Sequence, residues 1–234
     1  MINKIVPSVA DAVADVHDGA TVMIGGFGTA GQPAELIEAL IEQGAKGLTI
    51  VNNNAGNGEI GLAALLKARR VRKIICSFPR QVDSQVFDAL YRAGEIELEL
   101  VPQGNLAERI RAAGAGIGAF FTPVGVGTEL AEGKETRVID GRTYVLELPI
   151  AADFALVKAR RADRWGNLVY SKTARNFGPI MATAAKCTVV QVEEIVELGA
   201  LDPETIVTPA LFVQRLVHVA RPLVKPHSIP QPSA

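Results

Sequence analysis

The stretch DGATVMIGGFGTAGQP, residues 18–33, decides the fold, because an apolar run leads through a glycine loop to Pro33 at the start of a helical pattern. Glycine adopts positive φ readily and lets backbone N–H groups approach a ligand closely. Proline suits the first helical position, where its missing N–H would have no partner. We therefore expect a strand, a loop that receives an anion or an acyl oxygen, and a helix. The expected binding residues are Gly25, Gly26, Phe27, Gly28, Thr29, Ala30 and Gly31.

Strand and helix patterns alternate after this stretch. Apolar strand patterns end at Val51 and cover residues 73–77 and 95–101, and helical patterns cover residues 33–43, 60–69, 83–93 and 105–113. Such alternation predicts an α/β fold with an open, mostly parallel sheet flanked by helices. The second half is richer in strands: Asp140-Gly141 predicts a hairpin turn, and further strands are expected at 154–159, 167–170 and 188–192.

Composition narrows the class of protein. The chain has 234 residues, of which 48% are hydrophobic and 21% charged, with a formal net charge of −1. These values fit one folded domain, expected over residues 1–220, and argue against disorder and against nucleic-acid binding by charge. Residues 221–234 are rich in proline and predict a flexible tail. Neither a signal peptide nor a membrane span is predicted, so a cytoplasmic protein is expected.

The glycine loop also fits the dinucleotide-binding pattern G-x-G-x-x-G at residues 26–31. A dinucleotide site requires an acidic residue at the end of the second strand, about 20 residues later. Here that strand ends in the uncharged Asn52-Asn53-Asn54. A nucleotide-binding oxidoreductase stays an alternative, as does a structural turn without a ligand.

The same run resembles the glycine-loop signature of the 3-oxoacid coenzyme A-transferases. The resemblance continues through NNAG at 53–56, PQGNLAERIR at 102–111, ARNF at 174–177 and VEEIV at 192–196. It extends to about residue 217 and is specific to the A (alpha) subunit of this family. It implies the family I CoA-transferase fold and transfer of CoA from succinyl-CoA to a 3-oxo acid. Residues 76–81 resemble the transferases that act on 3-oxoadipate, in the breakdown of aromatic compounds, more than those that act on acetoacetate.

The resemblance implies that the nucleophile lies in another chain. In the family, a glutamate in a Ser-Glu-Asn-Gly motif of the B subunit forms a glutamyl–CoA thioester, and this chain contains no such motif. We therefore expect a heteromer with a B subunit, often two of each, in which this chain has no activity by itself and no metal or redox cofactor takes part. Glu59 is the nucleophile alternative within the chain, although an acid in the first turn of a helix starting near residue 60 equally fits the helix dipole. The three histidines lie near the chain ends and suggest no catalytic triad or metal site: His17, His218 and His227. Cys76 and Cys187 are expected to be buried thiols.

The family resemblance places three amides beside the reacting carboxyl group, namely those of Asn53, Asn54 and Gln103. A neutral amide orients a carboxylate without stabilising it as strongly as a full charge does. Asparagines at a strand end also form Asx turns, which is the structural alternative.

Arg80 is a candidate for binding the second carboxylate of the acceptor, or else a solvent-facing arginine. Arg175 and Asn176 are expected either to reach the CoA phosphates or to brace the sheet. A non-catalytic binding protein is the third alternative.

Overall fold

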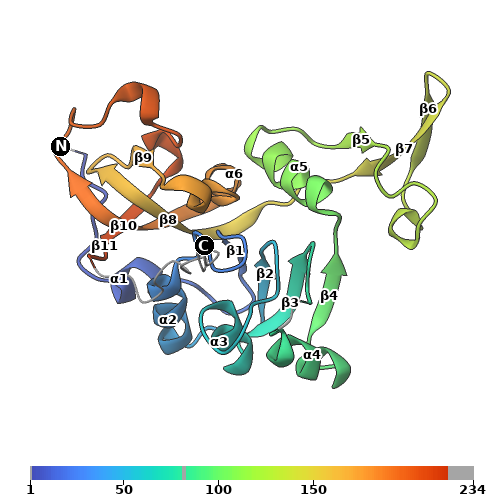
Figure 1. Cartoon of the computed structure of the whole chain (residues 1–234), viewed down its shortest axis with the longest axis horizontal. Helices are drawn as coiled ribbons and strands as arrows, with labels where there is room; N and C mark the ends of the chain where they lie inside the picture. Colours follow the sequence, from blue (N-terminus) through green and yellow to red (C-terminus); the bar gives the residue numbers. More distant parts are fainter. Residues whose placement is uncertain (1, 81–82, 221–234) are drawn as a thin grey trace, which may run out of the picture.

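The computed structural model describes residues 2–80 and 83–220 of the chain. Its main sheet has the strand order β11-β10-β8-β1-β2-β3-β4, with β9 paired to β8 (Figure 1). Every neighbouring pair in this order is parallel, and only β9 runs antiparallel to its neighbour, which confirms the predicted α/β class. The strands are β1 Thr21–Ile24, β2 Leu48–Val51, β3 Val71–Cys76, β4 Glu97–Leu100, β8 Ala152–Asp163, β9 Leu168–Val169, β10 Ala185–Val196 and β11 Arg215–His218.

Helices cover both faces of this sheet. They are α1 Val9–Val13, α2 Ala34–Gln43, α3 Leu62–Lys67, α4 Gln85–Arg92, α5 Gln103–Gly114 and α6 Gly178–Thr183. The short 3₁₀ turns are η1 Glu129–Ala131, η2 Lys172–Arg175, η3 Pro203–Thr205 and η4 Ala210–Phe212.

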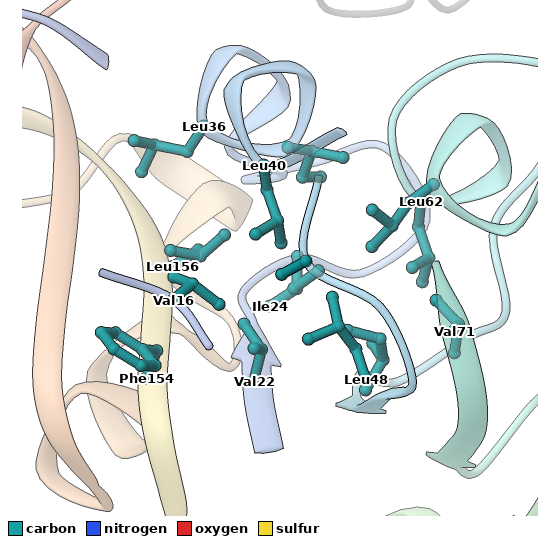
Figure 2. Packing of buried hydrophobic residues seen from close by; sticks show 14 of the residues in the cluster. Val16, Val22, Ile24, Leu36, Leu40, Leu48, Leu62, Val71, Phe154 and Leu156 are labelled. Carbon is teal, nitrogen blue, oxygen red and sulfur yellow. The ribbon is translucent and has the colours of Figure 1, made fainter. Parts of the chain in front are cut away.

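Alternation along the strands builds two hydrophobic cores. In β1, Val22 and Ile24 belong to the core under α1–α4, whereas Met23 belongs to the core under α5 and α6. Figure 2 shows Leu40 of α2 pointing down toward Ile24, whereas Leu36 extends to one side, above Leu156. Because successive side chains of a strand point to opposite faces, a strand covered on both sides must be apolar throughout. This explains the unbroken apolar run in the defining stretch, and truncation of the fully buried Leu40 to alanine would cost about 2–5 kcal/mol.

A second, antiparallel sheet projects from the main body (Figure 1). It has the order β5-β7-β6, formed by β5 Phe120–Thr122, β6 Thr136–Ile139 and β7 Arg142–Glu147. Asp140 (φ 49°) and Gly141 (φ 75°) both have positive φ, which is what a type I′ hairpin turn requires. The predicted hairpin is therefore confirmed. The small sheet joins the main body through α5, where Arg109 Nε donates a hydrogen bond of 2.7 Å to the carbonyl of Leu148.

Several element boundaries differ from the sequence prediction. The helix expected from residue 60 begins at Leu62, because Gly61 adopts φ 56° immediately before it. Strands β8 and β10 each span 12 residues and are longer than predicted, since they pair with each other along most of their length. Helices α1 and α6 and strand β11 were not predicted. The predicted tail, residues 221–234, lies outside the described residues, as do His227 and Gln81. Within the described ranges, no helix combines the length and apolar character needed to cross a membrane.

Candidate active site

The predicted site segments meet at one edge of the sheet. Strands β1, β2, β3 and β4 are neighbours and parallel, so their carboxyl ends lie at the same edge. The glycine loop follows β1, the asparagines follow β2, Arg80 lies after β3, and Gln103 begins α5 after β4. Ligands of open α/β sheets bind outside this edge. The convergence expected from the sequence is therefore present in the fold.

The glycine loop closes on itself as a tight turn. Gly26, Gly28 and Gly31 have φ of 128°, 61° and 78°, as expected for glycine positions, whereas Gly25 does not have positive φ. The N–H of Phe27 donates to the carbonyl of Ala30 over 3.0 Å, and the N–H of Ala30 donates back to Phe27 over 3.1 Å. These two N–H groups are therefore occupied within the loop. The turn presents the half-exposed ring of Phe27 at the edge of the sheet.

The turn η2 braces the glycine loop. Asn176 Nδ2 donates to the carbonyl of Ala30 over 2.9 Å and to that of Thr173 over 2.7 Å. Gly31 packs so closely on this segment that a Cβ atom there would lie 2.5 Å from the carbonyl oxygen of Ala174. Of the two sequence alternatives for Asn176, bracing is the one that its hydrogen bonds support, although the partner is the glycine loop rather than the sheet.

Two adjoining cavities lie on either side of Phe27 and Asn176, because both residues line each of them. The first has a volume of about 320 Å³ and is lined by Phe27, Gln103, Gly104, Ala107, Asn176, Phe177 and Ile180. The second has a volume of about 580 Å³ and is lined by Phe27, Ala30, Lys172, Thr173, Arg175 and Asn176. The structure thus brings Gln103 together with the glycine loop, although the two are far apart in the sequence.

The asparagines after β2 cross-link the strand ends. Asn52 Nδ2 donates to the carbonyl of Ile24 over 2.5 Å, and its Oδ1 accepts the N–H of Asn54 over 2.9 Å. Asn54 Oδ1 accepts the N–H of Gly56 over 2.8 Å, and Asn53 Oδ1 accepts the hydroxyl of Ser77 over 2.7 Å. The oxygens of Asn52 and Asn54 therefore form the Asx turns of the structural alternative.

Asn54 nevertheless keeps one unused donor. Its Nδ2 is buried and has no hydrogen-bond acceptor among the described residues. A buried donor without an acceptor costs about 1–3 kcal/mol, which is unusual in a folded chain. The linings of the two cavities include neither Asn53 nor Asn54, so this donor is set apart from Gln103 in the isolated chain.

Arg80 is engaged within its own chain. Its Nε lies 2.7 Å from Asp88 Oδ1, and its guanidinium carbon lies 5.9 Å from the centre of the Tyr91 ring. Arg80 lines neither cavity beside the glycine loop. The structure therefore supports the solvent-facing alternative more than a role beside the loop.

No strong nucleophile is found at this edge of the described chain. Burial raises the pKa of the Cys76 thiol to about 12, which leaves it protonated. Cys187 was expected to be buried but is only half-buried, and burial still raises its pKa.

Glu59 is exposed and pairs with Lys67 at 3.0 Å. It precedes α3, so the expected position in the first helical turn is wrong. His17 and His218 are exposed, and the described residues contain no cluster of three or more metal-ligating acids, histidines or cysteines.

Sequence reasoning missed a third cavity, of about 480 Å³, between β4, α5 and β7. Its charged groups neutralise one another: Arg109 Nη1 lies 3.0 Å from Glu99 Oε1, and Lys134 Nζ lies 2.7 Å from the deeply buried Glu147 Oε1. Lys73 Nζ also donates to Glu99 Oε2 over 2.6 Å. No local sequence signal links these residues, because they come from separate parts of the chain. With its charges paired internally, this network fastens the small sheet to the main body.

Comparison with known proteins gives consistent results. The family described as Coenzyme A transferase matches residues 6–219. The chain is 70% identical to the A subunit of 3-oxoadipate CoA-transferase from Pseudomonas putida, over 94% of this chain and 95% of the relative. It is 50% identical to the A subunit of a probable succinyl-CoA:3-ketoacid coenzyme A transferase from Bacillus subtilis, over 92% and 90%. An acyl-CoA transferase structure from Escherichia coli O157:H7 has the same fold, with a TM-score of 0.80 and 21% identity. The match covers 93% of this chain and 47% of that longer one.

Proposed function

The chain belongs to the coenzyme A transferase family, and on that premise we propose that it is the A subunit of a succinyl-CoA:3-oxoadipate CoA-transferase. The choice of 3-oxoadipate as substrate rests on the 70% identity, over nearly the full length of both chains, to an A subunit named for 3-oxoadipate. The relative named for 3-ketoacids is 50% identical, and acetoacetate is accordingly the second-choice acceptor.

The proposed reaction divides the chemistry between two chains. A carboxylate of the partner attacks the thioester carbonyl of succinyl-CoA and expels the CoA thiolate, leaving a mixed anhydride. The thiolate then attacks the partner's glutamyl carbonyl, which releases succinate and leaves a glutamyl–CoA thioester. The same two steps in reverse, with 3-oxoadipate as the attacking carboxylate, form the new acyl-CoA. Covalent catalysis of this kind requires an activated carboxylate and donors for the tetrahedral oxyanion.

Within this scheme, the present chain supplies neutral donors. Gln103 is exposed at the start of α5 and lines a cavity with Phe27, so its amide is placed to orient a carboxyl group there. The buried Nδ2 of Asn54 lacks an acceptor in the described chain and is a candidate donor in the assembled enzyme, with Asn53 beside it. Amides suit this task because they donate hydrogen bonds without holding the resting carboxylate in a strong ion pair.

A partner chain at this edge is supported by apolar exposure. Four large side chains are exposed in or after successive strands: Phe27 (46%), Ile60 (52%) and Phe78 (55%) follow β1, β2 and β3, and Leu100 (44%) ends β4. Large exposed apolar patches mark interaction sites, and a partner that covers this edge of the sheet would bury these four side chains. The relatives are themselves named as A subunits, which implies a partner, and we propose a heterotetramer of two such chains with two B subunits. In this proposal, the complex uses CoA thioesters as substrates, requires no metal or redox cofactor, and acts in the cytoplasm.

The decisive experiment traps the intermediate in the purified complex of this chain with its B subunit. After incubation with succinyl-CoA and borohydride, mass spectrometry should locate the modified carboxyl on the partner, and this chain alone should give no acyl exchange. Modification of this chain, or exchange without a partner, would contradict the proposal. Turnover on 3-oxoadipate and acetoacetate then separates the two acceptors.

Two further outcomes address other classes of function. Binding of NAD to this chain in calorimetry would support an oxidoreductase. Absence of any CoA transfer in the presence of the B subunit would support a non-catalytic binding protein.

A further inference from the structure

Two cations beside the glycine loop have no countercharge among the described residues. Lys172 and Arg175 are both exposed, and neither forms an ion pair with any residue that the structure describes. By contrast, Arg80, Arg109 and Lys134 each pair with a carboxylate of the chain. The cavity of about 580 Å³ that Lys172 and Arg175 line contains no acidic side chain. A hollow with two uncompensated positive charges is suited to an anion.

The backbone of η2, the turn that carries both cations, has an unusual conformation. Lys172 has φ 48°, in the left-handed region that few non-glycine residues adopt. Such conformations cluster at ligand sites, where the surrounding structure maintains them. Here the surrounding structure includes the bond from Asn176 to the glycine loop and the close approach of Gly31 to Ala174. The two cations are therefore carried on a segment that is fixed relative to the loop.

The cationic cavity adjoins the cavity that contains Gln103. Phe27 and Asn176 line both, so these two side chains stand between the positive charges and the amide at the proposed reacting carboxyl. A short acyl group held with its reacting end near Gln103 would direct its far end past Phe27 toward Lys172 and Arg175. Because the two cavities share a wall, the cations are placed for an anion that belongs to the acyl group itself.

The two acyl groups of the proposed reaction share one feature. Succinyl and 3-oxoadipyl groups each keep a second carboxylate at the far end, whereas acetoacetyl has none. A carboxylate that leaves water requires a compensating cation, and arginine binds it through paired N–H donors. We infer that Lys172 and Arg175 bind this distal carboxylate and so select dicarboxylic acyl groups. The inference rests on the proposed function, and it assigns to this turn the role first considered for Arg80.

The test uses Lys172→Gln, Arg175→Gln and the double variant, each in complex with the B subunit. Arg92→Gln, an exposed arginine at the end of α4 that lines neither cavity, serves as the matched control. The donor arm compares succinyl-CoA with acetoacetyl-CoA in forming the glutamyl–CoA enzyme. The acceptor arm compares 3-oxoadipate with acetoacetate in discharging it. Single-turnover mass spectrometry follows the amount of glutamyl–CoA enzyme over time, so that slow transfer of acetoacetyl groups and fast transfer of dicarboxylic groups are both measurable.

Loss of one charge-assisted hydrogen bond should lower the rate with succinyl-CoA and 3-oxoadipate about 10- to 150-fold in each single variant. Rates with acetoacetyl-CoA and acetoacetate should stay within about twofold of the parent complex, as should all rates of the control. An equal decrease with both thioesters would place CoA phosphates at these cations and overturn the inference, as would unchanged rates throughout. Failure of the parent complex to transfer CoA to any acceptor would instead contradict the proposed function.

Discussion

Replacing Gly31 with alanine tests whether the glycine loop depends on its contact with η2. Gly31 has φ 78°, and a Cβ atom there would lie 2.5 Å from the carbonyl oxygen of Ala174. The left-handed conformation costs an alanine about 1–2 kcal/mol. Relief of the clash must displace backbone rather than a flexible side chain, for which about 1–3 kcal/mol is typical. The sum, about 2–5 kcal/mol, corresponds to a decrease in melting temperature of about 4–20 °C for a domain of this size.

Gly28→Ala is the matched control. Gly28 has φ 61° in the same loop, but a Cβ atom there would have no neighbour within 4 Å. It should therefore lose only the conformational contribution, about 1–2 kcal/mol or about 2–8 °C. The assay is thermal unfolding of the assembled complex at one fixed protein concentration, because association itself contributes to stability. Equal decreases for Gly28→Ala and Gly31→Ala would refute the claim that packing on η2 limits this position.

Three further outcomes are expected. Gln103→Ala should lower turnover about 10- to 1,000-fold with the complex still assembled on gel filtration, as loss of an oxyanion-type donor does, and near-normal rates would remove Gln103 from the site. Glu59→Ala should leave the covalent intermediate trappable on the B subunit, whereas its disappearance would place the nucleophile in this chain. Burial raises the pKa of Glu99, but hydrogen bonds from Lys73 and Arg109 outweigh burial and hold it below 4.5. The ionised carboxylate therefore stabilises the fold at neutral pH, and this stability is lost as the pH falls below about 4.5 through the pKa of the folded state. In Glu99→Gln, the midpoint of urea unfolding should consequently fall less between about pH 6 and about pH 3 than it does in the parent protein.

Local chemistry explains the predictions that were confirmed. The hairpin at Asp140-Gly141 was predictable because both turn residues tolerate positive φ, and the parallel sheet because apolar runs alternated with amphipathic helices. Boundaries were less predictable. The start of α3 moved because Gly61 adopts a left-handed conformation in a loop that folds back on Gln32, so that an added Cβ would meet the Gln32 side chain.

The family, the α/β class and the position of the glycine loop and Gln103 at one sheet edge were determined by the sequence alone. The α/β class and the loop positions depend on residue type and spacing within about a dozen residues, and the family depends on several such segments along the chain. Parallel strands then align their carboxyl ends. Only the tertiary structure decided that Asn176 braces Ala30 across 146 residues, that Arg80 is held by Asp88, and that Lys172 and Arg175 lie beside Phe27. Contacts between distant segments follow from how helices and strands pack, and packing leaves no periodic signal in the residues that it brings together.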